Sequence, residues 1–123
     1  MAAEAPGSLM APLVAALVDE ASRRGCSRDG LLRTLAVTED ELRSHDKRID
    51  LARLLAAWEQ AMRALDDPGL PIAVGKLASV ERFDVLGYAI YTRPSFREGI
   101  ETLLQFHDVI NDTGRFRMEP GPP

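Results

Sequence analysis

The side chains best suited to chemistry in this 123-residue chain are two histidines, His45 and His107, and a single cysteine, Cys26. His107 has no cysteine nearby, no second histidine and no acidic pair at ligand spacing, and metal sites normally need several ligands. His107 is therefore expected at the edge of the core, in preference to a role as a haem or metal ligand. One thiol cannot form an internal disulfide or a thiolate cluster, which indicates a reduced, cytoplasmic protein. We expect no metal and no cofactor.

Sequence signatures of the common catalytic chemistries are not found. The chain has no Gly-x-Ser-x-Gly nucleophile turn, no glycine-rich phosphate loop and no His-Glu-x-x-His zinc motif. A catalytic site built from scattered residues would leave no such signature, but nothing in the sequence points to one. The chain is predicted not to be an enzyme, and a small enzyme ranks last among the functions considered.

The stretch from Leu31 to Leu42 has the outline of a helix-turn-helix, whose second helix enters the major groove of DNA. Here the second helix would begin with Glu39, Asp40 and Glu41, three carboxylates facing a polyanion. Acidic residues at a helix N-terminus are explained by the helix dipole alone. The whole chain carries 15 basic and 19 acidic residues, a net charge of −4. No residue of this chain is therefore predicted to bind DNA.

Three aromatic side chains with polar tips, Trp58, Tyr88 and Tyr91, are candidates for holding a small molecule. Ligand pockets are mostly apolar and carry a few polar groups that orient the ligand. Together with His107, these residues form the predicted effector-binding set. Packing in the hydrophobic core explains the same residue types at helical spacing, and this alternative stays open.

Apolar residues at helical spacing predict short helices separated by turn signals in the first third of the chain. The first helix runs from Leu9 towards Gly25, a plausible left-handed stop. Ser27 is expected to cap a second helix. Thr38 and Glu41 form a capping box, so a third short helix begins there.

The clearest predicted helix is capped by Asp50 and stops at Asp66-Asp67-Pro68-Gly69. Glu59 and Arg63 are spaced for an i,i+4 ion pair. Its apolar face is expected to comprise Leu51, Leu54, Leu55, Trp58, Met62 and Leu65.

The second half of the chain is predicted to hold helices at 70–78 and 85–91, then a long helix that starts with a second capping box, Ser95 and Glu98. Residues 115–119 alternate polar and apolar and indicate the start of a strand, which cannot stand without a partner. The predicted fold is mainly α, a small multi-helix domain with at most a short C-terminal strand. An α+β domain cut before its sheet is complete is the alternative. The face of the long helix is expected to comprise Phe96, Ile100, Leu103, Leu104, His107 and Ile110.

The composition, 46% hydrophobic and 28% charged residues, is typical of a soluble globular domain. Residues 9–18 are apolar enough to be compared with a signal peptide, but Glu4 is the only charge before them and Asp19 and Glu20 follow directly. No stretch approaches the ~18–20 apolar residues that cross a bilayer. Neither a targeting segment nor a membrane partner is expected.

Several short motifs follow one another in a distinctive order along the chain. They are Leu31-Leu32, Leu42, Arg48-Ile49-Asp50, Trp58-Glu59, Asp67-Pro68-Gly69-Leu70, Gly75, Leu86-Gly87-Tyr88, Arg93-Pro94-Ser95-Phe96-Arg97-Glu98-Gly99-Ile100 and Phe106-His107. The ordered series resembles the N-terminal, arabinose-binding-like domain of AraC/XylS-type transcription regulators. The likeness extends from about Leu9 to Met118.

The resemblance implies that residues 9–119 are part of a sensor domain, preceded by a disordered stretch 1–8 and followed by a Pro-rich tail 120–123. It implies an unknown small-molecule effector, a homodimer, and promoter binding through a separate C-terminal domain that this chain lacks. The later part of the sensor domain is also expected to be missing, and Asp50 stands where the family commonly has proline. A helical protein–protein interaction or dimerisation module without a ligand is the alternative function.

Overall fold

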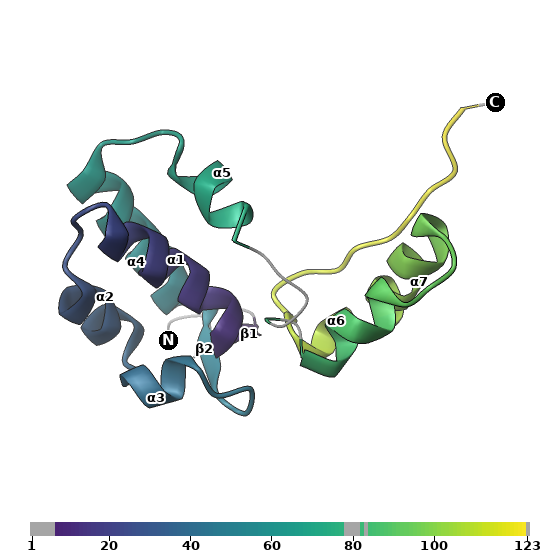
Figure 1. The fold of residues 1–123 in the computed structure, drawn as a ribbon, viewed down its shortest axis with the longest axis horizontal. Helices are drawn as coiled ribbons and strands as arrows, with labels where there is room; N and C mark the ends of the chain where they lie inside the picture. The colour runs from purple at the N-terminus through teal and green to yellow at the C-terminus, as the bar shows by residue number, and fades with distance from the viewer. Residues whose placement is uncertain (1–6, 78–81, 83, 123) are drawn as a thin grey trace, which may run out of the picture.

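The computed structural model of the chain describes residues 7–77, 82 and 84–122. Within these residues the chain is mainly helical with one small two-stranded sheet, which confirms the predicted fold class. Figure 1 shows two parts: a bundle of helices α1 to α5 with the sheet, and a pair of helices, α6 and α7, followed by an extended C-terminal segment. Of the stretch 1–8 predicted to be disordered, residues 1–6 lie outside the described residues and Ser8 begins β1.

Helix α1, Ala11–Arg23, is the centre of the bundle. Its side chains Val14, Leu17 and Val18 are almost fully buried because α2, α3, α4 and α5 all pack against it. Pro12 lies in the first turn, where its missing N–H would have no helical partner anyway. The chain leaves the helix through Gly25 with a φ of +108°, which confirms the predicted left-handed stop.

Both predicted caps of the next two helices are confirmed. The Ser27 hydroxyl accepts a hydrogen bond from the Gly30 amide at 3.1 Å at the start of α2, Arg28–Leu35. Thr38 and Glu41 form the reciprocal capping box of α3, Glu39–Leu42. These caps satisfy amides that have no partner inside a helix, which stabilises the first turns of two short helices.

Helix α4, Leu51–Leu65, has the predicted bounds, and the predicted Glu59–Arg63 ion pair is present at 2.5 Å. Asp50 occupies the position before the helix, but its side chain makes no cap hydrogen bond, so that part of the prediction was wrong. The predicted apolar face was also partly wrong, because Ala57 and Ala61 are its fully buried residues. Small side chains let α4 lie close to α2 and α1. The larger apolar residues flank that line, and Leu55 is 57% exposed.

The sheet joins two segments that are distant in the sequence. Strand β1, Ser8–Met10, pairs antiparallel with β2, Arg48–Asp50. An isolated bridge between Leu9 and Asn111 adds the C-terminal part of the chain on the other side of β1. The strand predicted at 115–119 is not observed, because no strand of the described residues pairs with this segment. Helix α5, Leu70–Gly75, covers α1 on another side.

Helices α6, Asp84–Tyr91, and α7, Phe96–Phe106, pack against each other and lead into a 3-10 turn, η2, at His107–Val109. Ser95 caps α7 by accepting from the Glu98 amide at 3.2 Å. The predicted apolar face of α7 was partly wrong, because Phe96 is 86% exposed. The buried residues of α7 are Gly99 and Thr102. The backbone of α6 comes close to Gly99, because a Cβ there would lie 3.4 Å from the backbone oxygen of Ile90. The two helices therefore approach each other across small residues.

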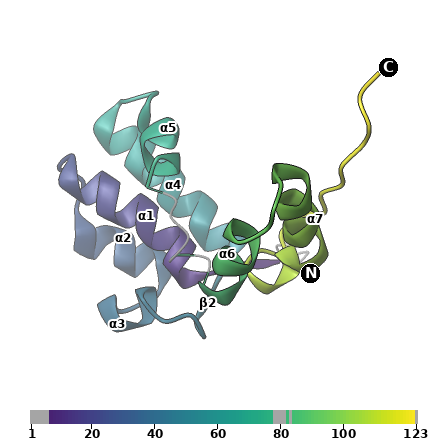
Figure 2. The same ribbon diagram turned by 45° about the vertical axis from the view of Figure 1, so that its right-hand side comes forward.

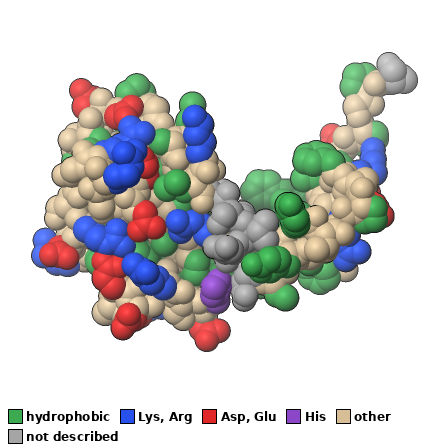
Figure 3. All heavy atoms as spheres, viewed as in Figure 1, with side chains coloured by type: hydrophobic (Ala, Val, Ile, Leu, Met, Phe, Trp, Pro, Cys, Tyr) green, Lys and Arg blue, Asp and Glu red, His purple; other side chains and the backbone are tan. Residues whose placement is uncertain are grey.

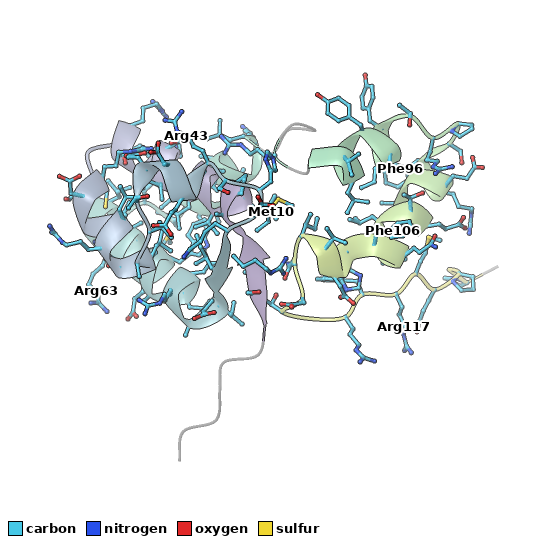
Figure 4. All side chains as sticks on the ribbon, turned by 90° about the horizontal axis from the view of Figure 1, so that it is seen from below. Met10, Arg43, Arg63, Phe96, Phe106 and Arg117 are labelled. Carbon is cyan, nitrogen blue, oxygen red and sulfur yellow. The ribbon has the colours of Figure 1, made fainter. Side chains whose placement is uncertain are left out.

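The two parts of the molecule meet at Met10, which packs with Leu86 and Ile110 in a small second cluster. The Met10 amide also donates to the Ile110 oxygen at 2.8 Å. Figures 2 and 4 show the α6–α7 pair beside the β1 end of the bundle, with Met10 at the boundary. None of the described helices is long and apolar enough to span a bilayer.

Candidate functional site

The four predicted effector-binding residues are distributed over both parts of the molecule. Trp58 lies on α4 and packs, partly buried, against the main core of the bundle. Tyr88 and Tyr91 lie on α6, where their side chains are 55% and 76% exposed. His107 begins the η2 turn after α7. The structure thus places Trp58 in a different part of the molecule from the other three.

His107 ties the C-terminal segment to the end of α7. Its Nδ1 lies 3.1 Å from the oxygen of Leu104 and its Nε2 3.2 Å from the oxygen of Gly114. The ring also packs edge-on against Phe116, with centroids 5.6 Å apart. Only the imidazolium can donate from both nitrogens at once, so hydrogen bonds to two carbonyls favour the charged form. The pKa of His107 is therefore raised, mainly by the Leu104 carbonyl, with smaller contributions from the Gly114 carbonyl and the charge of Asp108.

Tyr91 lines a cavity of about 330 Å³ at the turn between α6 and α7. Phe96 and Ile100 form its apolar wall, and Arg93 and Ser95 are the polar residues at its edge. This combination of apolar surface with a few polar groups is the one expected of a small-molecule pocket. Of the predicted set, Tyr91 is the residue that the structure brings into this hollow.

A second cavity, of about 300 Å³, lies between α1, the start of α2 and the end of α3. We call it the α1–α3 cavity. Its floor is apolar, and its walls carry charged and polar side chains. Figure 3 shows basic and acidic side chains interspersed over this part of the bundle, whereas hydrophobic side chains gather over α6 and α7. The lining residues of the α1–α3 cavity are Pro12, Ala15, Asp19, Arg28, Leu42, Arg43, His45 and Arg82.

Ion pairs fix two of the guanidinium groups of this cavity. Arg28 donates to Asp19 at 3.1 Å and to Glu39 at 3.0 Å, and Arg82 donates to Asp19 at 3.4 Å. The hydrogen bond to Glu39, followed by that to Asp19, raises the pKa of Arg28. The same bond from Arg28 lowers the pKa of Glu39, and the positive charge of Arg43 acts in the same direction. Both shifts favour the charged forms of Arg28 and Glu39, so this ion pair is stable at neutral pH.

The side chains at these sites are suited to binding a ligand. Within the part of the chain that the structure describes, no group of three or more His, Cys, Asp or Glu side chains is arranged to hold a metal ion. Cys26 is buried, so the thiol is part of the core. The two cavities offer guanidinium groups, hydroxyl groups and apolar walls, which recognise a ligand by charge and shape.

A comparison with protein families identifies the chain. Residues 25–122 match the family described as the arabinose-binding domain of AraC transcription regulators, N-terminal. The chain belongs to this family. No curated protein and no solved structure matches the chain at a significant level. Members of the family are regulatory, ligand-binding domains of transcription regulators, and the resemblance inferred from the ordered motifs is confirmed.

The α1–α3 cavity was missed by the sequence analysis. Its charged residues come from four segments that are far apart in the chain, and no spacing rule links Asp19 to Arg28, Arg43 or Arg82. The helix caps at Ser27 and Thr38 did predict where α2 and α3 begin, and two lining residues, Arg28 and Arg43, lie close to these helices' ends. Placing these helices against α1 still required the tertiary structure.

Proposed function

We propose that this AraC-family domain is the effector-sensing part of a bacterial transcription regulator. The match of the family over residues 25–122 is the observation that carries the proposal. A small molecule binds the domain in the cytoplasm and favours one arrangement of the regulator over another. A separate C-terminal domain with two helix-turn-helix units then binds the promoter. This chain has a net charge of −4, so it has no general attraction for the phosphate backbone of DNA.

The junction between the two parts provides a route for such a switch. An effector changes an equilibrium only when it binds one state more tightly than the other. The α6–α7 pair contacts the bundle through the small cluster around Met10 and through β1. A ligand that bridges or loosens this contact changes the position of α6 and α7, and with it the surface offered to the rest of the regulator.

The residues proposed to contact the effector remain Trp58, Tyr88, Tyr91 and His107. Tyr91 lines the hollow between α6 and α7 together with Phe96, which supports its part in the proposal. Tyr88 lies one helical turn earlier on α6. Tyr91→Ser is expected to weaken an effector that binds in this hollow without unfolding the domain, because the tyrosine is 76% exposed.

A thermal-shift screen of small metabolites against the purified chain tests the proposal. A ligand that binds the folded state raises the midpoint by mass action, and the increase grows with ligand concentration. The expected result is at least one chemical class that stabilises the chain in a saturable way and changes promoter binding of the intact regulator. A complete screen without a stabilising class, or a stabilising ligand without effect on the intact regulator, would contradict the proposal.

A second function, self-association, is favoured by the exposed apolar side chains of α6 and α7. Val85, Tyr91 and Phe96 are each more than three quarters exposed, while the apolar residues of α1 are mostly buried within the bundle. We therefore propose that a homodimer would form through α6 and α7. Sedimentation of the chain over a range of concentrations should show a dimer that Phe96→Ser weakens, and a strictly monomeric chain would refute it.

A further inference from the structure

We propose that the α1–α3 cavity binds the carboxylate of a small organic acid, with Arg43 as its main anchor. The inference rests on the proposed function in one respect only, namely that this acid acts as the effector. Arg43 lies on the rim of the cavity directly after α3, and Figure 4 shows it on the bundle, apart from Phe96 and Phe106 of α7. The hollow at Tyr91 is a separate site on α6 and α7.

In the part of the chain that the structure describes, Arg43 differs from Arg28 and Arg82 in having no fixed acceptor for its guanidinium group. Within the described residues, no hydrogen bond or ion pair occupies the donors of its side chain, and its electrostatic partner is Glu39. The five N–H donors of a guanidinium form a planar fork that matches a carboxylate. An exposed guanidinium at the mouth of a cavity is therefore available to a ligand from solution.

The two paired guanidiniums show that the cavity already accommodates a carboxylate. Arg28 and Arg82 approach the Asp19 carboxylate from its two oxygens, at 3.1 Å and 3.4 Å. Among the described residues that line the cavity, three are arginines and one, Asp19, is acidic, while Glu39 pairs with Arg28 beside it. The side chains of Arg28 and Arg82 are 30% and 23% exposed, so water screens their charges only in part.

The apolar floor indicates an organic acid in preference to an inorganic anion. Pro12, Ala15 and Leu42 are buried residues that line the cavity beneath the charges. An aliphatic or aromatic body lying on this floor would remove apolar surface from water, while its carboxylate meets Arg43. A volume of about 300 Å³ fits a molecule at the small end of ordinary ligands.

Titration of the full chain followed by amide NMR tests this proposal with benzoate as the probe. Benzamide serves as the neutral counterpart and inorganic phosphate as the anion without an apolar body. Benzoate is expected to shift the amides of α1 near Asp19, of the start of α2 and of residues 42–45 in a saturable way. Arg43→Gln should weaken benzoate about tenfold or more, the effect of one charge-assisted contact.

A substitution that removes a negative charge is expected to have the opposite effect on benzoate affinity. Asp19→Asn removes the carboxylate that competes for Arg28 and Arg82, so benzoate binding should tighten severalfold. The matched controls are Arg53→Gln and Asp50→Asn, which make the same charge changes at exposed positions outside the cavity lining. Both controls should leave the affinity unchanged, because a general charge effect would move them equally.

Three outcomes would overturn the proposal. Benzoate shifts confined to residues 90–100 would place the ligand in the hollow at Tyr91, which leaves the sensing function standing and removes this site. Equal binding of benzamide, or stronger binding of phosphate, would show that the site does not select an organic carboxylate. Absence of any benzoate shift would also refute it, whereas the sensing function is judged separately by the metabolite screen.

Discussion

Arg48 makes hydrogen bonds to both parts of the domain, and its replacement should weaken the contact between them. Its Nε donates to the Ser8 hydroxyl at 2.7 Å, one terminal nitrogen to the Val109 oxygen at 2.6 Å, and the other to the Ser8 oxygen at 3.0 Å. The same terminal nitrogen lies 3.7 Å from Asp112. One side chain on β2 thereby contacts β1, the η2 turn and the C-terminal segment.

The expected loss in Arg48→Met follows from these contacts. A hydrogen bond from a charged donor contributes about 1.5–3 kcal/mol net, but the side chain is 35% exposed, so water replaces part of each bond. The Ser8 oxygen also keeps its bond from the Asp112 amide. We therefore expect a decrease of about 2–3 kcal/mol in the free energy of unfolding, a substantial share of the ~5–15 kcal/mol typical of a domain.

Urea unfolding measures the global loss, and amide hydrogen exchange shows where it occurs. Exchange should accelerate most at the Met10 amide and in α6 and α7, while the amides of α1 and α2 change only in proportion to the global loss. Arg53→Met, a change at an exposed position of α4, should cost less than about 0.5 kcal/mol. Unchanged exchange in α6 and α7, or equal losses in both variants, would refute the role assigned to Arg48.

Three further predictions concern the bundle and the C-terminal segment. Leu17→Ala should cost about 2.7–5 kcal/mol by urea unfolding, because the side chain is 1% exposed at the centre of the core. Gly25→Ala should cost about 1–2 kcal/mol because of its φ of +108°, whereas Gly75→Ala on α5 should be neutral or stabilising; equal effects would contradict this. The raised pKa of His107 means that its stabilising contribution is complete below pH 6.5 and is lost as the pH rises through the folded-state pKa; an NMR titration of His107 that shows a lowered pKa would contradict this.

The sequence predicted the local structure well because its signals are local. The stop at Gly25, the cap at Ser27 and the capping box at Thr38 each depend on residues within four positions, and all three are observed. Which face of a helix is buried depends on distant partners. On α4 the buried line is Ala57 and Ala61 because α1 and α2 come close there, and hydrophobicity alone favoured the leucines.

The strands and the candidate sites were less accessible to sequence reasoning. The β1–β2 pairing joins segments about forty residues apart, and neither three-residue strand carries a readable alternation. The four predicted effector contacts were chosen by residue type, and the structure distributes them over both parts of the molecule. The α1–α3 cavity exists only because α1, α2 and α3 are packed in a particular way, so single residues such as Arg43 gave no sign of it.

A calorimetric titration of the folded chain tests the central claim, that this AraC-family domain senses a small molecule. The ligand is the strongest stabiliser from the metabolite screen. A saturable heat of binding with one ligand per chain is expected. Only weak, unsaturable heats from every compound tested would contradict it and would leave the domain as an interaction module.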